Sequence, residues 1–252
     1  MDRKIKKTYN FVGNSIKIRN VAMALFLAVV VTFAGATAVK ADCPPIPDCW
    51  EPFTQATNPA TGDKWFFYTD PTTGCTFAFT FCYRVACGGA YNDIAIGPEI
   101  FPLDDNCVAS GFDPTQYKNI VEGAMGIAVA FMSRLMWGMD IPECPRISQV
   151  VWRLGKIECT SDLYTALRTF TIIMNGKPVE VTRIVRVTTA CETNARCWNR
   201  YRYCWQVVGG IQVLMPHLIS TGNSSWACPQ NFVPPDAAPA GQVVRCHTGL
   251  CL

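Results

Sequence analysis

The residues with the clearest chemistry in this 252-residue chain are its 14 cysteines, all of which lie after residue 42. An even number of cysteines behind an export signal predicts a framework of disulfide bonds rather than metal binding. The sequence leaves the pairing open, but Cys75 and Cys82 would face opposite ways in one strand and should bond to different partners. The disulfide candidates are Cys43, Cys49, Cys75, Cys82, Cys87, Cys107, Cys144, Cys159, Cys191, Cys197, Cys204, Cys228, Cys246 and Cys251.

The two histidines, His217 and His247, are the next candidates for chemistry. His217 lies in an apolar run, which favours a structural role. His247 follows Cys246, but in an exported chain we expect that cysteine in a disulfide rather than in a Cys/His metal site. The sequence contains no Gly-x-Ser-x-Gly elbow and no His-Glu-x-x-His motif. We therefore predict no catalytic residue, no cofactor and no metal ligand.

Carboxylates are the remaining candidates, as the Asp104-Asp105 pair and as Asp93 with Glu99. Their oxygens can bind Ca²⁺, and two carboxylates facing a sugar can hydrolyse a glycoside. Paired acids on a loop are more often simply solvated. We therefore expect that the chain is not an enzyme, with a carboxylate-dependent hydrolase as the weakest alternative.

Residues 1–41 have the basic, apolar and small-residue order of a secretory signal peptide. The apolar run over 21–37 is short for a membrane span, so we expect cleavage between Ala38 and Ala41 and no stable span afterwards. Seven of the 22 basic residues and one of the 19 acidic residues lie in this segment, which leaves a net charge of −3 on residues 42–252. The mature chain should therefore be secreted, extracellular or on the cell surface, without a nucleic-acid partner.

Two stretches of the chain share one pattern, which predicts two copies of an antiparallel β-hairpin module. In both, six residues separate two cysteines, and a third cysteine follows 24 or 25 positions after the second. The matching cysteines are Cys75, Cys82 and Cys107, and Cys197, Cys204 and Cys228. Because side chains alternate along a strand, each copy should present one aromatic face. These faces comprise Phe79, Phe81 and Tyr83, and Tyr201, Tyr203 and Trp205.

A helix is predicted between the two copies. Asp113 can cap its first turn, and Pro114 fits the first helical position. The run continues to residue 139 without another proline, and its apolar residues recur at helical spacing. This stripe comprises Ile120, Ala124, Ile127, Phe131 and Leu135. We expect the helix to be buried against a sheet, with packing on a neighbouring subunit or membrane insertion as the alternatives.

The fold class expected is mainly β with one central helix (α+β), in which two disulfide-stapled antiparallel β modules are related as an internal repeat. The segments are a signal over 1–41, a first Cys-rich β module over 42–110 and a central helical segment over 111–146. A second module over 147–230 contains the strong hairpin turn Asn175-Gly176. The Pro/Ala-rich tail over 231–252 is either a loose terminus pinned by a disulfide, or an arm that docks on another subunit through its run over 242–244.

These features favour a secreted, disulfide-stabilised structural or adhesive protein that self-associates, as the repeating subunit of an extracellular filament or surface layer. Any cysteine that joins subunits is sought first among Cys43, Cys49, Cys246 and Cys251. The alternative is a secreted carbohydrate-binding module that stacks exposed aromatic side chains on sugar rings. The tryptophan candidates for that role are Trp50, Trp65, Trp198, Trp205 and Trp226.

Overall fold

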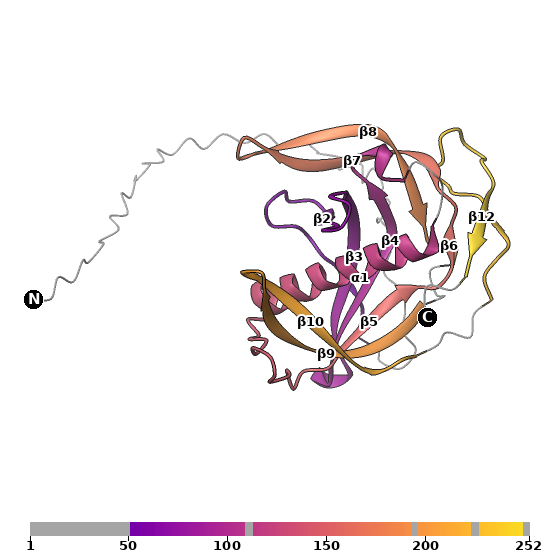
Figure 1. Cartoon of the computed structure of the whole chain (residues 1–252). Coiled ribbons are helices and arrows are strands. Elements are labelled where there is room, and N and C mark those ends of the chain that lie inside the picture. The colour runs from indigo at the N-terminus through magenta and orange to yellow at the C-terminus, as the bar shows by residue number, and fades with distance from the viewer. Residues whose placement is uncertain (1–50, 109–112, 193–195, 223–226, 249–252) are drawn as a thin grey trace, which may run out of the picture. The chain divides into compact units, whose positions relative to one another are not determined.

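The computed structural model describes residues 51–108, 113–192, 196–222 and 227–248, which form a mostly β fold with one long helix (Figure 1). The mainly β class with a central helix is therefore confirmed. The predicted signal over 1–41 lies outside these residues. The strands are β1 (Thr54–Gln55), β2 (Phe66–Thr69), β3 (Thr76–Ala86), β4 (Tyr91–Pro102), β5 (Trp152–Ile157), β6 (Thr160–Ser161), β7 (Tyr164–Met174), β8 (Lys177–Thr189), β9 (Arg196–Val208), β10 (Ile211–Ser220), β11 (Asn231–Phe232) and β12 (Val244–His247).

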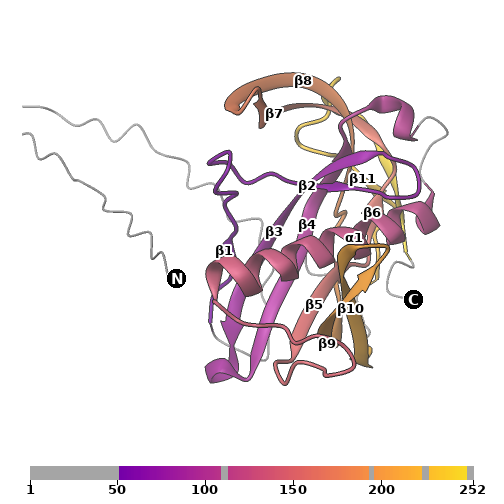
Figure 2. The same cartoon turned by 60° about the vertical axis from the view of Figure 1, so that its left-hand side comes forward.

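Nine strands form one sheet, in the order β1-β3-β4-β5-β9-β10, with β2 beside β3 and the β7–β8 hairpin joined to β4 (Figure 2). Its pairs are antiparallel except for β4 and β5, which run parallel from Asn92↔Trp152 to Ala95↔Gly155. Strands from both predicted β modules therefore belong to the same sheet and meet at this parallel pair and at the antiparallel pair of β4 with β8. The remaining three strands form a small sheet in the order β11-β12-β6.

Three hairpins form where the sequence predicts them. β3 pairs with β4, β7 with β8, and β9 with β10. The Asn175-Gly176 turn has φ angles of 53° and 74°. The Gly209-Gly210 turn has φ angles of 60° and 83°. Both residues of each two-residue turn are left-handed, which matches the right-handed twist of the flanking strands.

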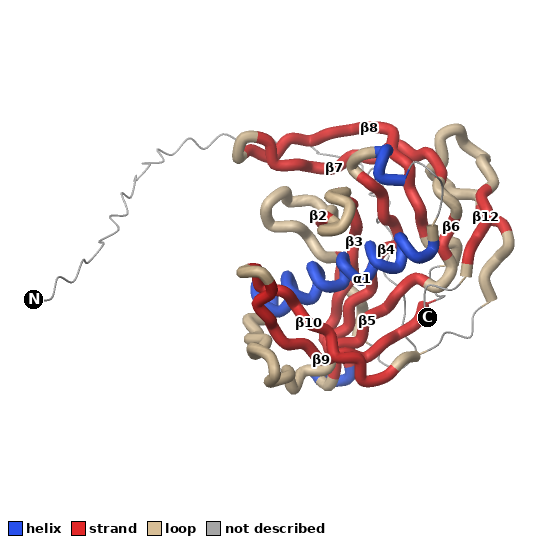
Figure 3. The backbone as a smooth tube through the Cα atoms, viewed as in Figure 1, coloured by secondary structure: helices blue, strands red, loops and turns tan. Residues whose placement is uncertain are grey.

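Helix α1 (Pro114–Phe131) begins as predicted, because the side chain of Asp113 accepts a 2.8 Å hydrogen bond from the backbone N–H of Thr115. It ends in a single π turn over Met132–Met136 (Figure 3). The helix packs on the sheet, and its buried residues are Tyr117, Ile120, Val121, Ala124, Met125, Ala128 and Val129. Ile127 was predicted in the buried stripe, but it is 39 % exposed. The side of the helix that the fold buries includes Val121 and Met125 instead, so Ile127 lies outside it.

Two apolar clusters form the core. The larger lies between α1 and the sheet and contains the buried rings of Phe79, Phe81 and Tyr203, with Tyr83, Tyr201 and Trp205 packed against it. The six predicted aromatic-face residues therefore share one core. The smaller cluster lies under the β7–β8 hairpin and includes Trp65, Phe101 and Phe170.

Disulfide bonds are confirmed, since the described part of the chain contains no free cysteine. Four bonds join Cys75 to Cys107, Cys144 to Cys204, Cys159 to Cys228, and Cys191 to Cys246. Cys82, Cys87 and Cys197 are disulfide-bonded as well. Cys75 and Cys107 pair within the first predicted copy, whereas Cys228 pairs with Cys159 and not with Cys197. The relation of the two hairpins as an internal repeat thus stays a prediction.

The Pro/Ala-rich tail docks on the chain's own fold. Strand β12 pairs with β6, and the N–H of Ala238 donates a 2.7 Å hydrogen bond to the carbonyl of Thr165. Cys246 bonds to Cys191 of the same chain, which removes it from the four cysteines among which a bond between subunits was to be sought. Cys43, Cys49 and Cys251 lie outside the described residues. Over the ranges that the structure describes, no helix has the length and apolar character needed to cross a membrane.

Candidate functional site

Asp93, one of the predicted carboxylates, is the centre of a buried ion cluster. It accepts a 2.8 Å hydrogen bond from Nε of Arg84, and 2.6 Å bonds from Nε and Nη2 of Arg153. The three residues are at most 4 % exposed and come from β4, β3 and β5. Buried charges are tolerated when they are paired in this way. Asp93 therefore fits a structural role that joins three strands.

Glu99 belongs to a second ion cluster, which ties the tail to the sheet. It accepts two 2.8 Å hydrogen bonds from Arg168, which also pairs with Asp236 of the tail. Burial raises the pKa of the Glu99 carboxyl, and the charge of Arg168 opposes that rise. Asp93 and Glu99 are thus engaged by different arginines, and neither is arranged as one half of a catalytic pair.

Asp104 is an exposed loop residue. Its side chain accepts a 2.9 Å hydrogen bond from the backbone N–H of Asn106, and Asp105 begins a short 3₁₀ turn over Asp105–Val108. This is the local turn bonding that Asp makes in loops without any ligand. The described contacts of the Asp104 side chain are therefore those of a loop turn.

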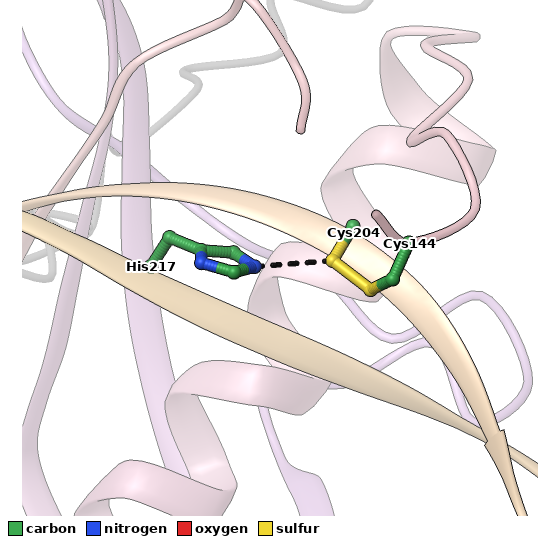
Figure 4. A group of neighbouring side chains, drawn as sticks. All are labelled: Cys144, Cys204 and His217. Atoms are coloured by element: carbon green, nitrogen blue, oxygen red, sulfur yellow. Dashed lines mark hydrogen bonds between the residues drawn. A yellow bond between two sulfur atoms is a disulfide. The ribbon is translucent and has the colours of Figure 1, made fainter. Parts of the chain in front are cut away.

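His217 lies beside a disulfide. Its Nε2 is 3.1 Å from Sγ of Cys204, which is bonded to Cys144 (Figure 4). Within the described ranges, these are the one group of three potential ligands close enough to share a metal ion. Because metal binding to cysteine requires thiolates, the oxidised pair does not form a metal site.

His247 has an acidic partner that the sequence analysis missed. Its Nε2 hydrogen-bonds with the carboxylate of Asp162, 85 residues away. The two meet because β12 pairs with β6 in the register His247↔Thr160. No local signal in the sequence reports this pairing. Both side chains are more than a third exposed, so the contact lies at the surface, where such pairs contribute little stability.

The tryptophans proposed for sugar stacking are not presented as an open platform. Trp65 is 3 % exposed, and Trp205 is half-buried against the main core. The ring of Trp198 lies over Gly155, where a Cβ would meet it at 2.6 Å, and it stacks on Phe53. Trp50 and Trp226 lie outside the described residues. The described tryptophans therefore pack within the fold.

Strand β10 is an open edge of the large sheet. It stands last in the strand order, and in the described part its backbone pairs with β9 alone. From Ile211 to Ser220 it carries no Asp, Glu, Lys or Arg. Edge strands usually carry charges that block pairing with another chain. Proline can also block an edge, because it has no N–H to donate. Counted along the β9–β10 pairing from Ile211↔Val208, the nitrogen of Pro216 points away from β9, so Pro216 interrupts the free edge at one position.

The other edge strands of the sheet are either short or partly covered. Strand β1 has two residues, too few to serve as a template. Strand β7 is covered by loop and tail groups: Nε1 of Trp65 donates to the carbonyl of Thr169 at 3.1 Å, and the N–H of Thr171 donates to Asp63 at 2.6 Å. Strand β2 is a further edge, but it has four residues and pairs with β3 alone. In the described part, β10 is therefore the longest edge strand without such cover.

Exposed apolar side chains concentrate on two hairpins. Of the 16 large apolar residues that are exposed in the described part, ten lie on these hairpins, which makes them the candidate contact surfaces. The β7–β8 patch comprises Leu167, Ile173, Met174, Val179 and Ile184. The β9–β10 patch comprises Val207, Val208, Val213, Leu218 and Ile219. Figures 1 and 2 both place the two hairpins on opposite sides of α1.

Comparison with protein-family models, with curated proteins and with solved structures finds no match to this chain.

Proposed function

We propose that this chain is a secreted, disulfide-stabilised structural or adhesive protein that self-associates, as the repeating subunit of an extracellular filament or surface layer. The observation that carries the proposal is the long, uncharged edge of β10 on a sheet whose other edges are short or partly covered. A second copy is the occupant that we assign to this edge, because pairing β10 with itself brings no like charges together.

Growth beyond a dimer needs a second contact. Pairing of one edge with the same edge of a second copy closes a twofold dimer and cannot extend by itself. The β7–β8 patch supplies a separate apolar surface on the opposite side of α1. It contains Leu167 and Ile184, which are 57 % and 61 % exposed and lie directly opposite each other in the strand pair. Two contact surfaces that face different ways support an extended assembly.

The disulfides fit this role. Each cross-link lowers the entropy of the unfolded chain, and every described cysteine is bonded. Bonded cysteines are typical of oxidising compartments outside the cytosol. A subunit that persists there without repair benefits from this kind of stabilisation.

The proposed self-association can be tested by placing positive charges on strand β10. In Val213→Lys/Leu218→Lys, lysines replace side chains that are 38 % and 55 % exposed. Wild-type protein should sediment as multimers and form regular fibres or sheets in negative-stain micrographs. The variant should need at least about tenfold higher concentration to assemble, because like charges would face each other across the paired strands.

The matched control is Val85→Lys/Val243→Lys, which adds the same charge at exposed apolar positions outside both patches. It should assemble like the wild type, and both variants should keep the wild-type unfolding midpoint. A wild-type chain that stays monomeric at all concentrations would overturn the proposal. Equal assembly of the two variants would show that β10 is not the contact.

A further inference from the structure

A pocket of about 170 Å³ opens between α1 and the β9–β10 hairpin. This is the size of a cavity that holds one six-membered ring, since an engineered cavity of about 150 Å³ binds benzene. Part of its wall is apolar and is formed by Met125, Leu154, Leu214 and Pro216. The pocket lies on the face of β9 opposite to Cys204 and His217, because it is lined by the alternate residues of both strands.

Two tyrosines from β9 supply hydroxyl groups to the pocket. Tyr203 lines it, is 3 % exposed, and has no hydrogen-bond partner for its hydroxyl among the described residues. Burial raises the pKa of Tyr203, so this hydroxyl stays protonated at neutral pH. The hydroxyl of Tyr201 accepts a 3.2 Å bond from Asn199, which leaves its own proton available to donate. Both hydroxyl groups can therefore exchange hydrogen bonds with the polar groups of a ligand in the pocket.

The carboxylate of Glu122 lines the pocket, and an ion pair with Lys156 balances its charge. Oε1 of Glu122 accepts a 2.9 Å hydrogen bond from Nζ of Lys156. The side chain of Lys156 is 4 % exposed, whereas that of Glu122 is 48 % exposed. Because the pair is neutral overall, neither a cation nor an anion is favoured. The outer oxygen of Glu122 can still accept a hydrogen bond from a hydroxyl.

We propose that this pocket binds one neutral hexopyranose ring, as a free sugar or as the terminal residue of a glycan. The apolar wall accommodates the C–H face of the ring, and Glu122 accepts from one sugar hydroxyl. Tyr201 donates to a second hydroxyl, and Tyr203 exchanges a hydrogen bond with a third group. This site uses the helix-facing side of the hairpin, whereas the proposed self-association uses the backbone edge of β10.

Binding can be tested by titration calorimetry of the full disulfide-bonded chain with methyl glycosides of glucose, galactose, mannose and N-acetylglucosamine. Immobilised glycans that end in the same sugars form a second arm. Binding in both arms identifies a free-sugar site, and binding to the immobilised glycans alone identifies a glycan end. Phenol serves as the flat-ring comparison.

Gly126 offers a blocking variant that should fold. It lines the pocket on α1, and a Cβ added there would meet no atom within 4 Å. The Cβ of a leucine therefore has room at this position, and the rest of its side chain would occupy the pocket. Gly126→Leu also replaces a poor helix former by a good one. We expect sugar binding to fall below detection while the thermal midpoint stays equal or rises.

The hydroxyl of Tyr203 is tested by Tyr203→Phe, with Tyr83→Phe as the matched control on the same core. The first should weaken binding about fivefold to tenfold through one lost hydrogen bond, and the second should leave it unchanged. A wild-type chain that binds no sugar in either arm, or that binds phenol alone, overturns the proposal. Unchanged binding by Gly126→Leu would do the same.

Discussion

At the scale of single residues, the carboxylates show why residue type alone does not define a site. Asp93, Glu99 and Asp104 look alike in the sequence. In the fold, the first is buried between two arginines, the second is tied to the tail, and the third is exposed. Their partners lie on strands that become neighbours only through long-range pairing. The sequence therefore predicts that these groups exist, but it does not predict what they contact.

Asp93→Asn should destabilise the protein strongly. The change removes the negative charge between Arg84 and Arg153, which would leave two buried guanidinium groups around a neutral amide. Breaking a buried pair from one side costs about 3–5 kcal/mol. Urea unfolding followed by tryptophan fluorescence measures the loss. The control is Asp104→Asn at the exposed loop, which should stay within about 0.5 kcal/mol of the wild type; equal losses in both would contradict the assignment.

At the scale of elements, local signals predicted the helix and hairpins well. Asp113-Pro114 marks the start of α1, and Asn175-Gly176 marks the turn between β7 and β8. The open β10 edge was not predicted, because the same uncharged sequence could equally have formed an internal strand. The parallel pair β4–β5 also has no local signal, since α1 and the segment after it separate its strands. Only the assembled sheet shows which strand is left without a partner.

The N-cap of α1 can be tested by Asp113→Ala. The side chain satisfies the N–H of Thr115, one of the donors that a helix leaves unpaired in its first turn. We expect a loss of about 1 kcal/mol in the free energy of unfolding. Asp113→Asn keeps an acceptor oxygen and should lose much less. If both variants lose the same amount, the charge of Asp113 matters and its cap does not.

At the scale of the whole molecule, long-range connections join the tail and both predicted modules into one structure. Arg168 joins β7 to β4 and to the tail through Glu99 and Asp236. The Cys191–Cys246 bond ties the end of β12 to the region after β8. These contacts leave the free edge of β10 as the principal unprotected backbone in the described part. In the described part, the tail is thus docked on the fold, and the β9–β10 hairpin keeps an open strand edge.

Removing the tail disulfide tests whether the covalent bond or the polar contacts hold the tail on the fold. In Cys191→Ala/Cys246→Ala, the cross-link between residues 55 positions apart is removed. The free energy of unfolding should fall by about 2–4 kcal/mol, mainly because the unfolded chain gains entropy. The docked tail should persist, since the Asp236 ion pair, the Ala238 hydrogen bond and the β12–β6 pairing do not depend on the disulfide.

Hydrogen exchange separates these two effects, because it reports local opening as well as global unfolding. The amide of Ala238 should stay protected in the double variant, apart from the decrease set by global stability. Cys75→Ala/Cys107→Ala is the control, since it removes a cross-link that does not include a tail residue and should lower protection at Ala238 through global stability alone. Exchange at Ala238 as fast as in an unfolded chain, in the first variant alone, would mean that the covalent bond holds the tail and the polar contacts do not.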